Sequence, residues 1–263
     1  IADYTLSPDE NMVLVPQTST ITPIYRHSYT ADYILLGSGK RLESFQAVRD
    51  ITFSADNKHI AYSKGNNLYL YNIASKTTTA ITDGGCWNKI INGTSDWVYE
   101  EEYGFTRAYA FSADGSKIAY LRFDESAVPT FEMMRFDNTL YNHAYSFKYP
   151  KAGDKNSVVE LYLYDIKSNS RTKIDVGSNT DQYIFNVAFT PANKLYFYRV
   201  NRLQNCFEVV MCNDNGEQKV IYTETSPRYV ERPNSSTITF IDGERFIVKE
   251  ETTTGWMHLY LHS

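Results

Sequence analysis

Hydrophobic and polar residues alternate along many short segments of this 263-residue chain, and one such segment occurs twice almost unchanged. The sequence FSADNKHIAY at residues 53–62 matches FSADGSKIAY at residues 111–120. Each copy has two alternating runs around a cluster of Asp, Asn or Gly, which predicts two antiparallel strands joined by a tight turn. Weaker copies of this hairpin begin at residues 6, 189 and 240.

A second segment also repeats, and the two repeats together predict the fold. LYLYNI at residues 68–73 matches LYLYDI at residues 161–166, and each is followed by a polar turn and a short strand-like run. Two successive hairpins make a four-stranded antiparallel sheet, which is the blade of a β-propeller. The sequence therefore predicts an all-β chain with about five blades' worth of strands, of which four are complete.

The C-terminal residues, HLYL at 258–261, resemble a blade strand whose partner is missing. No stretch rich in Pro, Gly or Ser divides the chain into two parts. We therefore expect residues 1–263 to form one partial propeller domain that belongs to a longer protein. Almost no helix is expected outside residues 95–104.

Composition supports this prediction and excludes several functions. Aromatic residues make up 15% of the chain, which favours strands over helices. A net charge of −5 provides no basic surface for nucleic acid, and no apolar run approaches the roughly 18 residues of a membrane-spanning helix. No spacing of Cys and His residues suggests zinc, so we expect neither a metal nor a cofactor.

Three cysteines, Cys86, Cys206 and Cys212, make an odd number. Cys206 and Cys212 lie at the two ends of a strand-like run that would span about 20 Å. A disulfide requires Cα atoms roughly 4.4–6.8 Å apart. We therefore expect all three to be free, partly buried thiols.

The segment DWVYEEEYGF at residues 96–105 departs from the strand pattern. Ser95 or Asp96 can cap a helix and Gly104 can end it, which predicts a helix of about two turns. Consecutive glutamates lie about 100° apart around such a helix, so two of the residues 100–102 can converge on a small cation while the third points elsewhere. Local departures from the global pattern often mark functional sites.

The interval between the third and fourth hairpins is the longest and contains residues 124–156. Insertions of this length in a compact repeat are usually functional or disordered. Two interpretations remain open. One is an arm that leaves the blade and carries apolar side chains such as Phe136, Tyr141, Tyr145 and Phe147, and the other is a hairpin that is merely longer.

The glutamate segment resembles the glutamate motif of the dipeptidyl peptidase IV family of serine exopeptidases. Further segments match that family in the same order: RHSYTA at 26–31, FD at 123–124, VP at 128–129, YPKAG at 149–153, and RLQN at 202–205, which resembles a propeller strand. The resemblance covers nearly the whole chain. It implies an eight-bladed propeller, of which this chain is an incomplete part, and an arm from this region that helps to form a homodimer.

The resemblance also implies a substrate-binding site. Glu101 and Glu102 match the glutamates that hold the free α-ammonium group of a peptide, and Arg26 matches an arginine that contacts the carbonyl region of the bound dipeptide. An ammonium group has three donors and a compact charge, so it needs carboxylate partners inside a cleft. Glu100 is expected to be structural. The aromatic residues around the motif are expected to pack in the core: Trp97, Tyr99, Tyr103 and Phe105.

A family loop that lines the outer substrate subsites matches residues 229–233 only in part. Arg232 and Pro233 agree with it, but Glu231 replaces an aromatic residue. We therefore include none of these residues in the predicted site.

The chain contains no Gly-x-Ser-x-Gly nucleophile sequence, and its five histidines suggest no catalytic triad. In the family the catalytic Ser, Asp and His lie in an α/β-hydrolase domain that follows this region. We therefore expect this chain to contain no catalytic residue and to be inactive alone. Its parent is expected to release N-terminal dipeptides, mostly after Pro or Ala, in an extracytoplasmic location.

Two functions from different classes remain. The first is the substrate-gating propeller of a periplasmic, secreted or membrane-anchored dipeptidyl peptidase, whose partners are peptides with a free N-terminus and its own hydrolase domain. The second is a propeller that only binds proteins or ligands, including one whose hydrolase domain has lost its nucleophile. Composition does not separate the two, because propellers support many functions.

Overall fold

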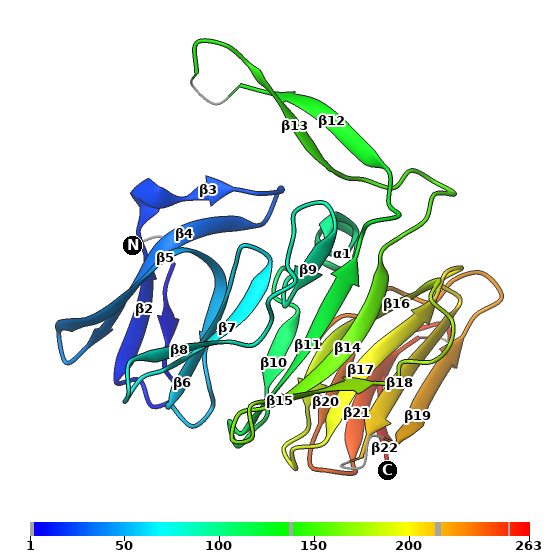
Figure 1. The fold of residues 1–263 in the computed structure, drawn as a ribbon. Coiled ribbons are helices and arrows are strands. Elements are labelled where there is room, and N and C mark those ends of the chain that lie inside the picture. The colour runs from blue at the N-terminus through cyan, green and yellow to red at the C-terminus, as the bar shows by residue number, and fades with distance from the viewer. Residues whose placement is uncertain (1–2, 137–138, 214–216, 252) are drawn as a thin grey trace.

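Antiparallel sheets make up most of the chain and follow one another around a fan (Figure 1). The structure is a computed structural model that describes residues 3–136, 139–213, 217–251 and 253–263. Within these ranges the single α-helix is α1 (Trp97–Tyr103), which lies within the predicted range of 95–104. No helix of the described residues has the length and apolar character needed to span a membrane.

The first two predicted blades form one continuous sheet in the order β1-β2-β4-β5-β6-β7-β8, with β3 paired to β4. Its elements are β1 (Thr5–Leu6), β2 (Met12–Pro16), the 3-10 turn η1 (Thr18–Thr20), β3 (Thr22–Pro23), β4 (Tyr29–Gly37), β5 (Lys40–Phe53), β6 (His59–Lys64), β7 (Asn67–Asn72) and β8 (Thr77–Ala80).

The sequence predicts these two blades as separate sheets. They are joined into one sheet because both share strand β5. It has 14 residues and pairs with β4 through its first part and with β6 through its last part. Irregularities in both pairings surround Ala47 (φ 51°) and Asp50 (φ 53°). Such bulges bend and twist a strand, so that one strand can serve two blades.

The remaining sheets agree more closely with the predicted repeat. The third blade has the order β10-β11-β14-β15 with β9 paired to β11, the fourth has the order β16-β17-β18-β19, and the last sheet has three strands, β20-β21-β22. Their bounds are β9 (Ile90–Asn92), β10 (Tyr109–Phe111), β11 (Lys117–Asp124), β14 (Val158–Asp165), β15 (Ser170–Ile174), β16 (Gln182–Phe189), β17 (Leu195–Asn201), β18 (Cys206–Cys212), β19 (Gln218–Thr225), β20 (Ile238–Phe240), β21 (Phe246–Glu250) and β22 (His258–His262).

The repeated hairpin turns connect neighbouring blades. In one turn, Ser112 Oγ donates to Asp114 Oδ1 at 2.6 Å and accepts from the Lys117 amide at 2.9 Å. The Asp114 amide then donates to Asn193 Oδ1 in the next blade at 3.0 Å. Gly115 has φ 72°, and a β-carbon there would lie 2.7 Å from Asp56 Cγ of the preceding blade. The residues that predict the turns therefore also set the spacing between blades.

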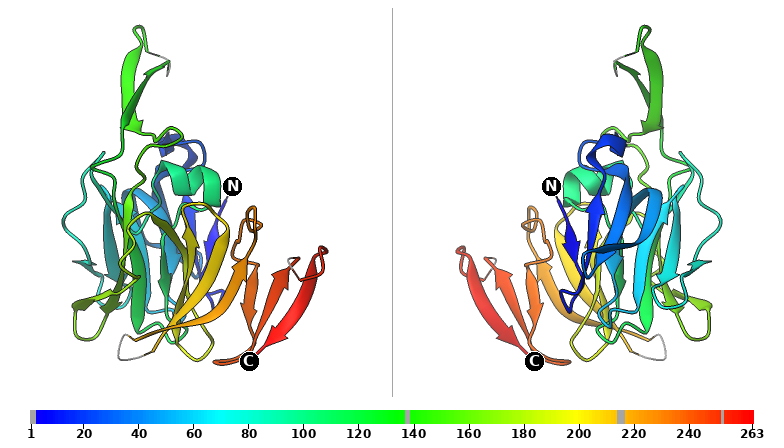
Figure 2. Two further views of the ribbon diagram at one scale, coloured as in Figure 1. Left: turned by 90° about the vertical axis from the view of Figure 1, so that its right-hand side faces the viewer. Right: turned by 90° about the vertical axis from the view of Figure 1, so that its left-hand side faces the viewer.

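Within residues 124–156, β12 (Thr130–Arg135) and β13 (His143–Lys148) form the arm, a two-stranded hairpin that stands away from the sheets (Figure 2). At its tip, Phe136 and Tyr141 are 79% and 80% exposed. Phe147 is only 7% exposed and Tyr145 is half-buried, because both side chains contact the loop of residues 24–28. Exposed apolar side chains are therefore confirmed for Phe136 and Tyr141 and wrong for Tyr145 and Phe147. The two strands β12 and β13 are called the arm root below, and Phe136, Leu140 and Tyr141 its tip.

Two further expectations need correction. The segment at residues 202–205, expected in a strand, forms the turn between β17 and β18, where Gln204 has φ 55°. The three cysteines are free as expected, but Cys86 is exposed rather than partly buried.

Candidate functional site

Helix α1 carries the glutamate motif and begins and ends at strong local signals. The Asp96 side chain caps it by accepting from the Tyr99 amide at 3.0 Å. Gly104 ends it in the left-handed region with φ 71°, where a β-carbon would be unfavourable. A helix of seven residues is too short to be stable alone, so packing must hold it in place.

The buried face of α1 supplies that packing. The ring of Tyr99 lies 5.0 Å from that of Phe123, and the ring of Tyr103 lies 4.2 Å from that of Phe185. The Ile184 amide donates to the Tyr99 hydroxyl at 3.0 Å, and Ser157 Oγ donates to Asp96 Oδ2 at 2.5 Å. The aromatic residues of the motif thus pack as predicted and fix the helix to the third and fourth blades.

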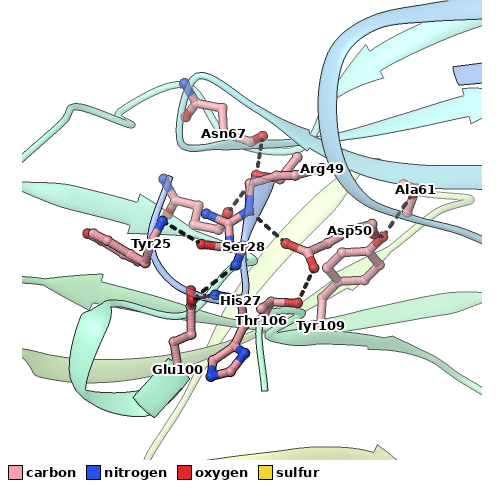
Figure 3. Close-up of polar contacts among 12 residues, drawn as sticks. Tyr25, His27, Ser28, Arg49, Asp50, Ala61, Asn67, Glu100, Thr106 and Tyr109 are labelled. Atoms are coloured by element: carbon pink, nitrogen blue, oxygen red, sulfur yellow. Dashed lines mark hydrogen bonds and ion pairs between the residues drawn. The ribbon is translucent and has the colours of Figure 1, made fainter. Parts of the chain in front are cut away.

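Glu100 joins α1 to the loop that carries Arg26 (Figure 3). Its side chain is almost fully buried, and Oε1 accepts from the His27 amide at 2.6 Å and from the Ser28 amide at 3.0 Å. A buried carboxylate with two amide donors is a strong anchor, because its charge strengthens both hydrogen bonds. The structural role expected for Glu100 agrees with this arrangement.

Glu101 and Glu102 lie on the more open side of the helix, and each faces an arginine from a different loop. Glu101 Oε2 is 4.0 Å from Arg26 Nη1, with side-chain exposures of 18% and 76%. Glu102 Oε2 is 3.9 Å from Arg232 Nη1, and this guanidinium also donates to the Glu102 carbonyl oxygen. The structure thus brings Arg26 to Glu101, while Glu102 faces the connection between β19 and β20.

These two ion pairs leave the carboxylates available to a ligand. Both distances exceed the roughly 2.7–3.2 Å of a hydrogen bond. Ion pairs this long, in which the arginine is mostly exposed to solvent, contribute only about 0–1 kcal/mol. An incoming ammonium group could therefore take the acceptor positions of Glu101 and Glu102 at little cost.

Arg232 contacts Glu102 in the candidate site, but the sequence prediction did not include it. Its neighbour Pro233 is buried, and the Arg232 guanidinium donates to the Glu102 carbonyl oxygen near the C-terminal end of α1. The agreement of Arg232 and Pro233 with the family loop was a usable signal, which the altered residue at position 231 weakened.

A buried acidic group was also not foreseen. Glu125 follows β11 and is fully buried, and the Asn88 amide and the Lys148 charge favour its ionised form only weakly. Burial, and then the nearby Asp96 carboxyl, raise the pKa of Glu125 to about 8. Burial also raises the pKa of Asp96. Within the described residues, no three His, Cys, Asp or Glu side chains are arranged to hold a metal ion.

A buried ion pair, Arg49 with Asp50, connects the second and third blades. Arg49 Nε lies 2.8 Å from Asp50 Oδ2, and Thr106 Oγ1 donates to Asp50 Oδ1 at 2.5 Å (Figure 3). Tyr109 donates through its hydroxyl to the carbonyl oxygen of Ala61 at 2.8 Å. These contacts fix the bulged part of β5 beside the segment that follows α1.

Comparison with known proteins shows the family to which the chain belongs. Residues 7–263 match the model of the dipeptidyl peptidase IV N-terminal region. A dipeptidyl peptidase 4 of Trichophyton tonsurans is 34% identical over 279 residues, which cover 99% of this chain and 35% of that protein. An inactive dipeptidyl peptidase 10 of Rattus norvegicus is 26% identical, with 93% of this chain and 32% of that protein covered. The chain spans about a third of the length of these relatives.

Solved structures agree with the sequence comparison. The crystal structure of Porphyromonas gingivalis dipeptidyl peptidase 4 matches 99% of this chain and 38% of that chain, with a TM-score of 0.91 and 34% identity. A putative dipeptidyl aminopeptidase IV from Bacteroides ovatus matches with a TM-score of 0.75 and 25% identity, covering 97% and 34% of the two chains. The predicted all-β partial propeller is therefore confirmed, and the chain belongs to the family of dipeptidyl peptidase IV N-terminal regions.

Proposed function

We propose that this chain is the propeller part of a dipeptidyl peptidase IV-like serine peptidase, and that it binds the free N-terminal amine of peptide substrates. The observation that carries this proposal is the pair Glu101 and Glu102. They occupy consecutive positions on a helix anchored through Asp96, Tyr99 and Glu100. An anchored helix holds both carboxylates in place before the ligand arrives, which reduces the entropy lost on binding.

The chemistry of a peptide N-terminus suits this site. An α-amino group has an ordinary pKa of about 7.7–8.0, and two adjacent carboxylates would raise that pKa by favouring the charged form. Arg26, which is mostly exposed, is free to turn from Glu101 toward a carbonyl oxygen of the bound peptide. With the amine held at the glutamates, only a peptide bond at a set distance can reach the catalytic serine, and such positioning supplies several kcal/mol of the barrier reduction.

The experiment that tests this function compares free and N-acetylated forms of one peptide in the full-length peptidase. Acetylation removes the charge and leaves the rest of the peptide unchanged, so kcat/KM is expected to fall at least about tenfold. Release of the dipeptide can be followed by chromatography. Equal cleavage of the two peptides would contradict recognition of the amine.

The whole-protein activity forms part of the same proposal. A hydrolase domain of the same protein would supply the Ser, Asp and His, and dipeptides would be released mostly after Pro or Ala in an extracytoplasmic compartment. Relatives named dipeptidyl peptidase 4 support this, since they match at 34% identity over almost the whole chain. The alternative, a propeller that only binds ligands, is favoured by the relative named inactive, which matches at 26%. A Gly-x-Ser-x-Gly sequence downstream, followed by Asp and His, would decide between them.

We further propose that the arm pairs two copies of the full-length protein. Its tip exposes three apolar side chains, Phe136, Leu140 and Tyr141, which are 79–90% exposed. Changing all three to Ser is expected to convert a dimer into a monomer, because it removes the apolar surface that pairing would bury. Light scattering after gel filtration measures the mass.

Leu203 provides a matched control for the tip variant. It is 75% exposed in the turn between β17 and β18, far from the arm in sequence. Changing Leu203 to Ser should leave the mass unchanged. A tip variant that keeps the mass of the unmodified protein would show that the arm is not the pairing element. Residues 137 and 138 lie outside the described residues and are left unaltered.

A further inference from the structure

The loop that carries Arg26 is held through its backbone. Residues 24–28 connect β3 to β4, and the loop closes on itself through the Ile24 amide, which donates to the Ser28 carbonyl oxygen at 2.9 Å. The Arg26 side chain is 76% exposed, and its ion pair with Glu101 is long. Its direction is therefore set by the groups that hold the loop, rather than by its own contacts.

Two elements from different parts of the chain, α1 and the arm, form hydrogen bonds with the backbone of this loop. On the side of α1, Glu100 accepts from the His27 and Ser28 amides. On the side of the arm, Arg135 Nη2 donates to the Pro23 carbonyl oxygen at 3.0 Å, and the Tyr145 hydroxyl donates to the Ile24 carbonyl oxygen at 2.8 Å. The peptide groups before and after Arg26 are thus fixed independently.

The root of the arm is shaped for this contact. The Arg135 guanidinium lies over the Tyr145 ring at 4.5 Å, which holds the two donors together. The Tyr25 ring of the loop packs against Phe147 at 5.7 Å and against Trp87 at 5.9 Å. Trp87 Nε1 also donates to the Ser146 carbonyl oxygen at 3.1 Å. The arm root therefore packs on the loop, whereas the tip extends away from it.

We propose that Arg135 and Tyr145 are positioning residues, which hold the loop so that Arg26 faces Glu101 and the bound peptide. This inference rests on the proposed function of Arg26. It gives the arm a second role, because its root becomes part of the substrate site while its tip remains free for pairing. Displacement of the arm root would then be transmitted to Arg26 through the Pro23 and Ile24 carbonyl groups and through the Tyr25 ring.

The test uses Tyr145→Phe and Arg135→Met in the full-length peptidase. Each removes one of these hydrogen bonds to the loop and keeps most of the side-chain volume, so KM for a peptide substrate with a free N-terminus is expected to rise about three- to tenfold with little change in kcat. Arg135→Lys should restore part of the loss, since a lysine can still donate to the Pro23 carbonyl. Tyr141→Phe, which removes a hydroxyl from an exposed tyrosine at the tip, is the matched control and should leave KM unchanged.

A double-mutant cycle with Arg26→Met separates positioning from a general structural effect. If the arm acts through Arg26, adding Tyr145→Phe or Arg135→Met to Arg26→Met should raise KM no further. Fully additive losses, or single variants with unchanged KM, would overturn the proposal. If Arg26→Met itself leaves KM unchanged, the assignment of Arg26 fails first. Light scattering on each variant should show the mass of the unmodified protein.

Discussion

Replacing Glu101 or Glu102 by Gln in the full-length peptidase is expected to lower kcat/KM at least about tenfold for peptides with a free N-terminus. Each change keeps the shape of the side chain and removes one negative charge from the place where the ammonium group would bind. Loss of one partner of a desolvated charge pair typically costs 2–5 kcal/mol. Initial rates at substrate concentrations well below KM measure the effect directly.

Glu100→Gln is the matched control for these two substitutions. Glu100 is buried, and a single oxygen accepts both loop amides. A glutamine can keep that oxygen in place, so the loss of kcat/KM should be much smaller than for the two neighbours. Equal losses in all three variants would mean that the motif acts through general charge or stability, and the assignment of Glu101 and Glu102 would then be wrong.

Stability of the folded protein is expected to fall as pH rises from about 5 to about 8, and Glu125 should cause much of this fall. The unfolded chain releases this proton near the ordinary pKa of 4.5, whereas the folded chain retains it until pH approaches 8. Within that window the folded state binds the extra proton, so each pH unit removes about 1.4 kcal/mol of stability. The total is on the order of several kcal/mol.

Glu125→Gln tests this expectation, because glutamine keeps the shape without the titrating proton. The variant should lose stability less steeply than the unmodified protein when denaturant unfolding is measured at pH 5, 6.5 and 8. Part of the fall should remain, since burial also raises the pKa of Asp96. Asp124→Asn, at the neighbouring and more exposed position, should change the slope only slightly, because the Asp124 charge is the smallest contribution to the raised pKa of Glu125. Identical slopes in the unmodified and Glu125→Gln proteins would contradict the assignment.

Much of the fold could be predicted because its signals are local. Alternating residues and Asp, Asn or Gly turns predict each hairpin within about ten residues, and the same turns form the contacts between blades. The α1 helix could likewise be predicted from its own segment, because Asp96 caps its start and Gly104 ends it. The family resemblance of that segment added Glu101 and Glu102 as candidate site residues, and the resemblance of residues 26–31 added Arg26.

What depended on distant parts of the chain could not be predicted in this way. Strand pairing decides that β5 belongs to two blades, since its bulges form only against β4 and β6. Packing between the arm root and the Arg26 loop buries Phe147.

The chain's own sequence determined the repeat, the turns, the capped helix and the family. Only the tertiary structure decided that Arg232 reaches Glu102 and that burial beside Asp96 raises the pKa of Glu125. The physical reason is range. Turn and cap preferences act between residues a few positions apart, whereas desolvation and ion pairing depend on which distant segments the packed sheets bring together.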